Sequence, residues 1–358
     1  MVKDVKDLRI VFIQLIMVLV LPVAMGSCRP SDQKVQVQIT GLNAKSTASL
    51  RGLFVVNEKV IWASGSAETV LRSIDGGESW QTKQITAAEE NDFRSIHAWD
   101  ENSAMVFGVA GPDFAYKTED GGETWDVVYR DTTAGLFFNS LKFADELNGL
   151  AVSDPVDGKF FVIRTEDGGQ NWSRVTNLPD VEEGEANFAA SNTCIEYLPS
   201  GKAWIASGGM DARVFYSEDF GRSWEVAKTP MIRGQATSGI FSVAFKNERQ
   251  GIVVGGTYDK PEITTNVASY TTDGGINWLP SQTMTSGYRS CVQFVGDGKQ
   301  EFALALGKTG MDFSSDGGVN WSPLSNQGFY TFRAIPGQLS GFAAGSDGRI
   351  AKISFVYQ

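Results

Sequence analysis

Four arginines of this chain recur at one position in a series of short β-type runs. Each follows an apolar or aromatic residue at the start of its run, as Leu50-Arg51, Phe93-Arg94, Tyr288-Arg289 and Phe332-Arg333. A guanidinium group is always charged, and its planar set of N–H donors matches the oxygens of a carboxylate or a phosphate. A fold that gathers these arginines at one rim would bind a carboxylate, a phosphate or an acidic side chain. The structural alternative is that each pairs with a neighbouring acid or carbonyl and fills a channel.

Other polar and aromatic residues fall in loops that lead to the same rim. They complete the set of candidate ligand-binding residues: Asn139, Asp154, Glu185, Asp211, Tyr258, Asp259 and Tyr288. Carboxylates opposite arginines can form an acid/base pair, although an acid in a surface loop is more often structural or solvated. His97 is the only histidine, which excludes histidine-rich metal sites and argues against a histidine-based triad. No glycine-rich dinucleotide motif opens a helix, so we expect neither a metal nor a cofactor.

A repeated phrase, Ser/Thr-x-Asp-x-Gly-x-x-Trp, predicts the elements that position these residues. Its six aspartate and tryptophan pairs are Asp75 and Trp80, Asp120 and Trp125, Asp167 and Trp172, Asp219 and Trp224, Asp273 and Trp278, and Asp316 and Trp321. The aspartate can accept hydrogen bonds from backbone N–H groups ahead of it, and glycine supplies a positive φ. The tryptophan after the turn can pack against the next repeat. We call this phrase the box turn and expect it to be a folding device, not a catalytic one. Because the fourth copy has Phe220 in the first glycine slot, only the second glycine is required.

The spacing of the box turns predicts an all-β propeller. Consecutive box aspartates lie 43 to 54 residues apart, which is typical of one four-stranded blade per repeat. Six box turns, with a last blade completed by the strand 35–40, make a seven-bladed ring over residues 35–358; a six-bladed ring is the alternative. In such a ring the box turns lie on the face opposite the start of the innermost strands. Beside the four arginine-bearing starts, the innermost strands of blades three to five are expected to begin at 138–139, 188–191 and 241–242. Cys194 and Cys291 fall in inner strands of non-adjacent blades, so we expect no disulfide.

The first 34 residues predict export. Residues 1–27 have a basic start and a 16-residue apolar stretch, Ile10 to Met25, and they end before Cys28. This pattern predicts a lipoprotein-type signal peptide with lipidation at Cys28 and a tether over 28–34; a plain secretory signal with an incidental cysteine is the alternative.

Removing residues 1–27 takes away three positive and two negative charges, so the formal net charge moves from −11 to −12. This charge argues against nucleic-acid binding and against docking on anionic lipid. We therefore expect a monomer in the cell envelope that contacts the membrane only through its lipid.

The box series resembles the Asp-box, or BNR, repeat of exported bacterial propellers that are similar to the photosystem II stability and assembly factor. Phrases such as Ser153-Asp154-Pro155-Val156-Asp157-Gly158 carry the resemblance, which covers residue 52 to the end. It implies a seven-bladed ring with an arginine patch that receives a protein partner, for which Arg51, Arg94, Arg289 and Arg333 are the candidate equivalents. Members of the family are also labelled loosely as oxidoreductase or glycosyl hydrolase.

These observations favour a binding or assembly module that holds a protein segment or a small anionic or glycan ligand at the channel mouth. One alternative is a glycan hydrolase of sialidase type, since sialidases also carry Asp boxes and use arginines, a tyrosine with a glutamate, and an aspartate. Tyr288, Tyr330 and Asp154 are the residues that such a scheme would recruit. The other alternative is an oxidoreductase with a cofactor that no motif reveals. Whether the chain is an enzyme stays open at this point, because a fold alone does not decide function.

Overall fold

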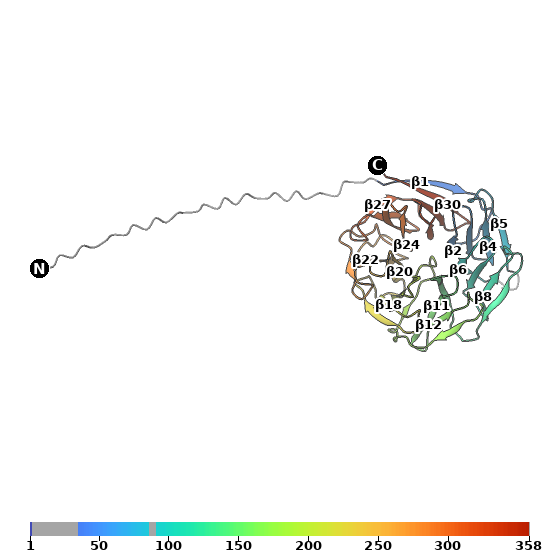
Figure 1. The fold of residues 1–358 in the computed structure, drawn as a ribbon, viewed down its shortest axis with the longest axis horizontal. Helices are drawn as coiled ribbons and strands as arrows, with labels where there is room; N and C mark the ends of the chain where they lie inside the picture. Colours follow the sequence, from blue (N-terminus) through green and yellow to red (C-terminus); the bar gives the residue numbers. More distant parts are fainter. Residues whose placement is uncertain (2–34, 86–90, 358) are drawn as a thin grey trace. The chain divides into compact units, whose positions relative to one another are not determined.

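The computed structural model describes residue 1, residues 35–85 and residues 91–357, and all regular elements in these ranges are β-strands. The strands form seven sheets that follow one another round a ring (Figure 1). The prediction of an all-β, seven-bladed propeller is confirmed, and the six-bladed alternative is wrong. The predicted signal peptide, Cys28 and the tether lie outside the described residues. No helix among the described residues has the length and apolar character needed to cross a bilayer.

Blades one to three each contain four antiparallel strands, which run in chain order from the ring centre outwards. Blade one has β2 (Leu50–Val55), β3 (Ile61–Gly65), β4 (Thr69–Ser73) and β5 (Gln81–Gln84). Blade two has β6 (Phe93–Ala98), β7 (Ala104–Gly108), β8 (Asp113–Thr118) and β9 (Asp126–Arg130). Blade three has β10 (Phe138–Phe143), β11 (Gly149–Val156), β12 (Lys159–Thr165) and β13 (Ser173–Val175).

Blades four and five are connected by two additional short strands that a regular propeller does not have. Blade four has β15 (Ile195–Tyr197), β16 (Ala203–Ala206), β18 (Arg213–Ser217) and β19 (Glu225–Lys228). Blade five has β20 (Ser238–Phe245), β21 (Gly251–Thr257), β22 (Ala268–Thr271) and β23 (Leu279–Pro280). Two short strands, β14 (Glu185–Ala186) and β17 (Gly208–Gly209), extend the sheet of blade five beyond β20 in the order β14-β17-β20. The residues that lead into blade four are thereby attached to blade five.

The N-terminal strand closes the ring. Blade six has β24 (Cys291–Gly296), β25 (Glu301–Gly307), β26 (Gly310–Ser314) and β27 (Ser322–Ser325). Blade seven has β28 (Thr331–Ala334), β29 (Ser340–Ala344) and β30 (Ile350–Tyr357), with β1 (Val35–Leu42) outermost. β1 pairs with β30 over eight residues, from Val35 opposite Tyr357 to Leu42 opposite Ile350, and the blue and red strands lie side by side in Figure 1. The predicted closure by residues 35–40 is confirmed, and it covers the edge that β30 would otherwise expose.

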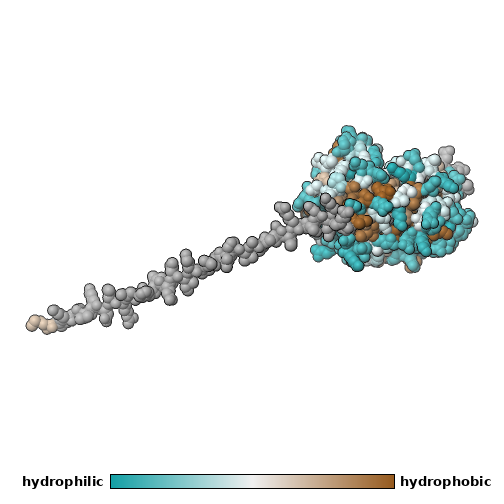
Figure 2. Space-filling model, turned by 90° about the horizontal axis from the view of Figure 1, so that it is seen from above, coloured by the Kyte–Doolittle hydropathy of each residue, from teal (hydrophilic) through white to brown (hydrophobic). Residues whose placement is uncertain are grey.

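The hydrophobic core is divided among the interfaces between blades. One buried cluster joins Met105 and Phe107 of blade two to Phe138 and Phe161 of blade three, and another joins blades five and six around Ile252 and Trp321. Such face-to-face packing buries one face of each sheet against its neighbour. Hydrophilic residues cover most of the side shown in Figure 2, and hydrophobic residues show between them.

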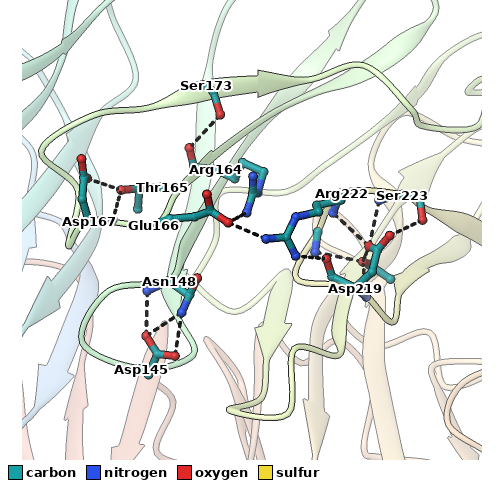
Figure 3. A network of polar contacts seen from close by, with 12 residues as sticks. Asp145, Asn148, Arg164, Thr165, Glu166, Asp167, Ser173, Asp219, Arg222 and Ser223 are labelled. Atoms are coloured by element: carbon teal, nitrogen blue, oxygen red, sulfur yellow. Dashed lines mark hydrogen bonds and ion pairs between the residues drawn. The ribbon is translucent and has the colours of Figure 1, made fainter.

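The six box turns share one hydrogen-bond pattern. In each, the first Ser or Thr hydroxyl donates to the box aspartate and accepts from the N–H of the second glycine. The aspartate also accepts the N–H of the residue four positions later, at 2.9–3.0 Å. Figure 3 shows two of these turns, at Asp167 and Asp219, where Glu166 of one blade accepts a hydrogen bond from Arg222 of the next at 2.6 Å.

The two glycine slots of the box turn differ in what they tolerate. Both have positive φ, for example 80° at Gly76 and 89° at Gly77, and Phe220 adopts 62° in the first slot. A Cβ at the first slot meets a single atom at 3.2 Å at Gly76, whereas at the second slot it would lie 2.7 Å from Leu150 at Gly221. The second slot therefore needs glycine for blade packing as well as for its positive φ. This explains why a residue other than glycine, Phe220, is found in a first slot and none is found in a second slot.

We expect Asp120→Ala to lower the melting temperature of the propeller at neutral pH. Hydrogen bonds from Thr124 hold the pKa of Asp120 at about 2, below its ordinary value of 3.8. Because the pKa of Asp120 is lower in the folded than in the unfolded protein, its carboxylate stabilises the fold above pH 4, and this stabilisation is lost as the pH falls towards 2. The melting temperatures of wild type and variant, measured by circular dichroism, should therefore converge over that range. Asp120→Asn, which keeps one acceptor oxygen, should be less destabilised; an alanine variant with an unchanged melting temperature would contradict the folding role.

Candidate functional site

The two faces of the ring are built from different parts of each blade. The box turns lie beside the turns that connect the first and second strands, since Gly76 N–H donates to Lys59 at 2.9 Å and Gly121 N–H donates to Asn102 at 2.8 Å. Those turns follow the ends of the innermost strands. The opposite face, where the innermost strands begin, therefore carries the channel mouth, as the sequence predicts.

A pocket of about 340 Å³ opens at this mouth. We call it the mouth pocket, and its lining residues come from blades one, two, five, six and seven and from the segment that precedes blade four: Arg51, Arg94, Phe188, Ala189, Ala190, Phe241, Tyr258, Tyr288, Lys308 and Tyr330. Three of them are cationic and five are aromatic. No carboxylate of residues 35–85 or 91–357 lines the pocket, although the whole chain carries a net charge of −11. The chemistry of the mouth pocket thus favours an anionic group accompanied by an apolar one.

The floor of the mouth pocket is a segment that crosses the channel. We call residues 188–193 the plug. Its Asn192, at a φ of 57°, accepts the N–H of Leu141 from blade three at 2.8 Å and donates to Ile96 of blade two at 3.0 Å. The carbonyl of Thr193 accepts the N–H of Val243 from blade five at 2.9 Å. The sequence predicts that the innermost strand of blade four begins at 188–191; that prediction is wrong, because these residues bond across the channel and β15 begins only at Ile195.

Arg51 and Arg94 lie in the mouth pocket and keep donors available. The guanidinium of Arg51 stacks over the Tyr330 ring at 4.4 Å, and its only hydrogen bond among the described residues goes to the carbonyl of Ala190 at 3.3 Å. Burial and the nearby charge of Arg94 lower the pKa of Arg51. Arg94 forms an ion pair with Asp92 through Nε at 2.8 Å, and its Nη atoms have no hydrogen-bond partner among the described residues. Two guanidinium groups that repel each other favour an anion between them.

Arg289 does not belong to this rim. Its Nε lies 2.6 Å from the Asp312 carboxylate, and the two side chains are only 2% and 1% exposed. Nη1 donates to the Tyr288 carbonyl and to the Thr309 hydroxyl. The prediction of four arginines at one rim is therefore corrected here: blade six supplies a buried acid to Arg289, whereas Arg94 pairs only with the partly exposed Asp92 and Arg51 forms no ion pair among the described residues.

Arg333 lies below the plug and does not reach the mouth pocket. Its Nη2 donates to the plug carbonyls of Ser191 at 3.1 Å and Asn192 at 3.0 Å, and burial lowers its pKa. It lines an inner cavity of about 100 Å³ that receives residues from all seven blades. The ion pair between Lys142 and Glu196, at 2.9 Å, lies in the same cavity. Arg333 thus fills the channel, which is the structural alternative considered for the arginines.

The acids that were candidates from the sequence lie away from the mouth pocket. Asp154 is half-buried, accepts a hydrogen bond from Asn139 at 3.0 Å, and has its pKa raised by burial. Glu185 is buried against Arg213, whose Nε lies 3.1 Å from its Oε1. Asp211 lies 3.4 Å from Arg233, and Asp259 is exposed outside the pocket lining. Each of these acids is better explained by local structure or by solvation.

Of the remaining candidates, Tyr258 and Tyr288 do line the mouth pocket. Tyr258 is 44% exposed at its rim, whereas Tyr288 is 6% exposed, and burial raises the pKa of its phenol. A sialidase-type arrangement would need this tyrosine beside a carboxylate and several arginines, and the described residues do not bring those groups together. They also contain no cluster of three His, Cys, Asp or Glu side chains that could hold a metal. Cys194 and Cys291 are buried and unpaired.

The sequence does not identify Phe188, Phe241 or Lys308 as lining residues of the mouth pocket. Phe188 and Phe241 mark predicted strand starts, and Tyr330 lies two residues before another, but nothing in the sequence indicates that their rings turn to one pocket. Lys308 comes from the tight turn between β25 and β26, and its Nζ donates to the Tyr258 carbonyl at 2.6 Å. The sequence does carry an aromatic residue at the predicted strand starts, but it recurs on blades two to seven and so does not single out the rings that line the pocket.

Comparison with known proteins agrees with the fold and with the sequence resemblance. No family model matches the chain. The chain is 24% identical over 246 residues to the photosystem II assembly lipoprotein Ycf48 of Synechococcus sp. (strain CC9902), and the match spans 68% of this chain and 65% of that protein. The predicted resemblance to the photosystem II assembly-factor propellers is thereby confirmed.

Solved structures support the propeller fold. A structure described as YCF48 bound to D1 peptide aligns with a TM-score of 0.60 at 17% identity, over 89% of this chain and 94% of that one. YCF48 from Cyanidioschyzon merolae gives 0.64 at 17% identity, over 88% and 98%. The WD40 propeller domain of Doa1 gives 0.58 at 12% identity, over 89% and 97%. Because the Doa1 domain aligns almost as well, these structures establish the fold alone.

Proposed function

We propose that this chain is an exported, lipid-anchored binding or assembly propeller whose mouth pocket receives an acidic segment of a partner protein. The observation that carries the proposal is the pairing of Arg51 with Arg94 in a pocket that no described carboxylate lines. A carboxylate placed between these guanidinium groups gains charge-assisted hydrogen bonds and relieves their mutual repulsion. The assembly lipoprotein among the relatives and the neighbour that is bound to D1 peptide support a protein partner over a small ligand.

Binding of peptides tests the proposal. A protein consisting of residues 29–358 is immobilised, and peptides are selected on it from a random display library, with the D1 peptide as a first defined probe. The selected sequences should be enriched in Asp and Glu. Arg51→Gln combined with Arg94→Gln should weaken their binding at least about tenfold, since each lost charge-assisted bond is worth roughly 1.5–3 kcal/mol before desolvation.

A matched control separates this effect from a general change of charge. Arg249→Gln removes one exposed positive charge near the box turns, where Gly274 N–H donates to the Arg249 carbonyl at 2.9 Å. It should leave peptide affinity within about twofold of the wild type, because it is remote from the mouth pocket. A selection that yields no peptide with preference for the wild type over the double glutamine variant would refute the proposed function.

The lipid anchor has a test of its own. Cys28 supplies the thiol that a lipoprotein-type signal would acylate, and the relative Ycf48 is described as a lipoprotein. We expect the wild-type protein to incorporate a labelled fatty acid in cells and Cys28→Ser to incorporate none, while the body folds in both. Label retained by the serine variant would exclude Cys28 as the attachment site.

A further inference from the structure

The mouth pocket has two chemically different halves. Arg51 and Arg94 come from blades one and two, whereas the aromatic residues come from the plug and from blades five to seven. Tyr330 of blade seven joins the halves, because the Arg51 guanidinium lies 4.4 Å from the centre of its ring. An anionic group held by Arg51 is therefore adjacent to an aromatic surface.

The aromatic half is a wall of rings that hold one another in place. Phe188 and Phe241 stack with centroids 3.9 Å apart and an interplanar angle of 3°. Tyr288 meets Phe241 edge-on at 4.8 Å and is only 6% exposed. Rings that are already ordered in the free protein lose little conformational entropy when a ligand packs against them. The wall can therefore act as a preformed surface for a large apolar side chain.

The rim of this wall is open to a partner. Tyr258 is 44% exposed and lies edge-on to Phe241 with centroids 6.3 Å apart. Its carbonyl accepts a hydrogen bond from Lys308 at 2.6 Å, which fixes the loop of blade five against the turn of blade six. Tyrosine is among the residues that contribute most binding energy at protein interfaces, and this one is exposed and locally supported.

We infer that the mouth pocket recognises a peptide in which an acidic residue is adjacent to an aromatic residue. The carboxylate lies between Arg51 and Arg94, and the neighbouring ring packs between Tyr330 and the accessible rings of the wall, Phe188 and Tyr258, which the buried Phe241 supports. This inference rests on the proposed function and specifies the segment that the pocket selects. An acidic residue alone would not specify this segment, since its carboxylate contacts only the arginine half of the pocket.

Eight-residue peptides test the inference directly. Each places one motif in a Gly/Ser background, and the three motifs are Asp-Phe, Asp-Ala and Asn-Phe. Binding of fluorescent versions is measured by polarisation. The Asp-Phe peptide should bind about tenfold more tightly than the Asp-Ala peptide, which is a typical contribution of one buried aromatic contact. The Asn-Phe peptide should lose at least as much, because it lacks the carboxylate.

A protein variant assigns the aromatic preference to the wall. Tyr258→Ala removes an exposed ring, and the fold should tolerate it; it should weaken binding of the Asp-Phe peptide about fivefold and binding of the Asp-Ala peptide by a clearly smaller factor. Ile74→Ala, which truncates a side chain that is 50% exposed in a box turn, is the matched control and should change neither.

The possible outcomes separate this inference from the proposed function. Equal affinity for the Asp-Phe and Asp-Ala peptides, with both weakened in the Arg51→Gln, Arg94→Gln variant, would overturn the inference and leave the proposed function intact. Absence of binding by every acidic peptide would overturn both. Phenylacetate that binds as tightly as the Asp-Phe peptide would show that the pocket takes a small aromatic acid, and it would overturn the assignment to a peptide.

Discussion

Replacing Arg289 with alanine is expected to lower the free energy of unfolding by about 3–5 kcal/mol, because it leaves a buried charge without its partner. The Asp312 carboxylate is 1% exposed, lies 2.6 Å from the Arg289 guanidinium, and otherwise accepts hydrogen bonds only from Ser286 among the described residues. Chemical denaturation monitored by tryptophan fluorescence would measure the loss. Ligand binding to the protein that remains folded should be unchanged, since Arg289 does not line the mouth pocket.

A double variant distinguishes loss of the ion pair from loss of packing. Arg289→Met combined with Asp312→Leu removes both charges and keeps similar volume, so it should recover much of the stability that the single variant loses. An Arg289→Ala protein as stable as the wild type but defective in peptide binding would restore Arg289 to the ligand-binding rim.

The second large effect is expected from Glu185→Ala, again about 3–5 kcal/mol of unfolding free energy. The Glu185 side chain is fully buried, accepts Arg213 Nε at 3.1 Å, and accepts the Glu182 N–H at 2.9 Å. Without this carboxylate, the Arg213 guanidinium, which is 7% exposed, keeps among the described residues only more distant acids at 3.8 Å and the Asp180 carbonyl at 3.0 Å. Differential scanning calorimetry would measure the destabilisation, and Glu185→Gln should be milder because it keeps an acceptor oxygen.

Glu185→Ala should also loosen the plug. Glu185 belongs to β14, which pairs with β17, and the plug begins only two residues after that strand. Hydrogen exchange of residues 188–193 should therefore accelerate more than exchange in β28, which lies in blade seven. Unchanged stability and exchange would mean that the Glu185–Arg213 pair is not what holds the segment between blades three and four.

The repeated architecture could be predicted from the sequence because each box turn reports its own blade. Asp75 to Asp316 mark six equivalent turns, and the alternating residues of 35–40 identify the strand that completes the seventh blade. The placement of the arginines on the face opposite the box turns follows from strand order alone. Local hydrogen bonding and glycine geometry decide these features, and both are visible in the sequence.

The destination of each arginine could not be predicted, because it depends on partners far away in the chain. Arg51 and Arg289 occupy the same position of their blades, yet only Arg289 has a buried acid, Asp312, within reach. The crossing of the plug is equally non-local, since Asn192 bonds to blades three and two, about fifty and a hundred residues earlier. The interval of 52 residues between Asp167 and Asp219 leaves room for a crossing segment, but it does not single this segment out, since the next interval, to Asp273, is 54 residues long.

Site-specific photo-crosslinking measures most directly whether the mouth pocket is the binding face. A benzoyl-phenylalanine replaces Tyr258 at the mouth or, in a second protein, Ile74 in a box turn; both positions are exposed, at 44% and 50%. Illumination with a bound acidic peptide should produce a crosslinked product from position 258 and none from position 74. The product should disappear when Arg51→Gln and Arg94→Gln are added. Crosslinking that is equal at the two positions, or that persists without the two arginines, would contradict the account.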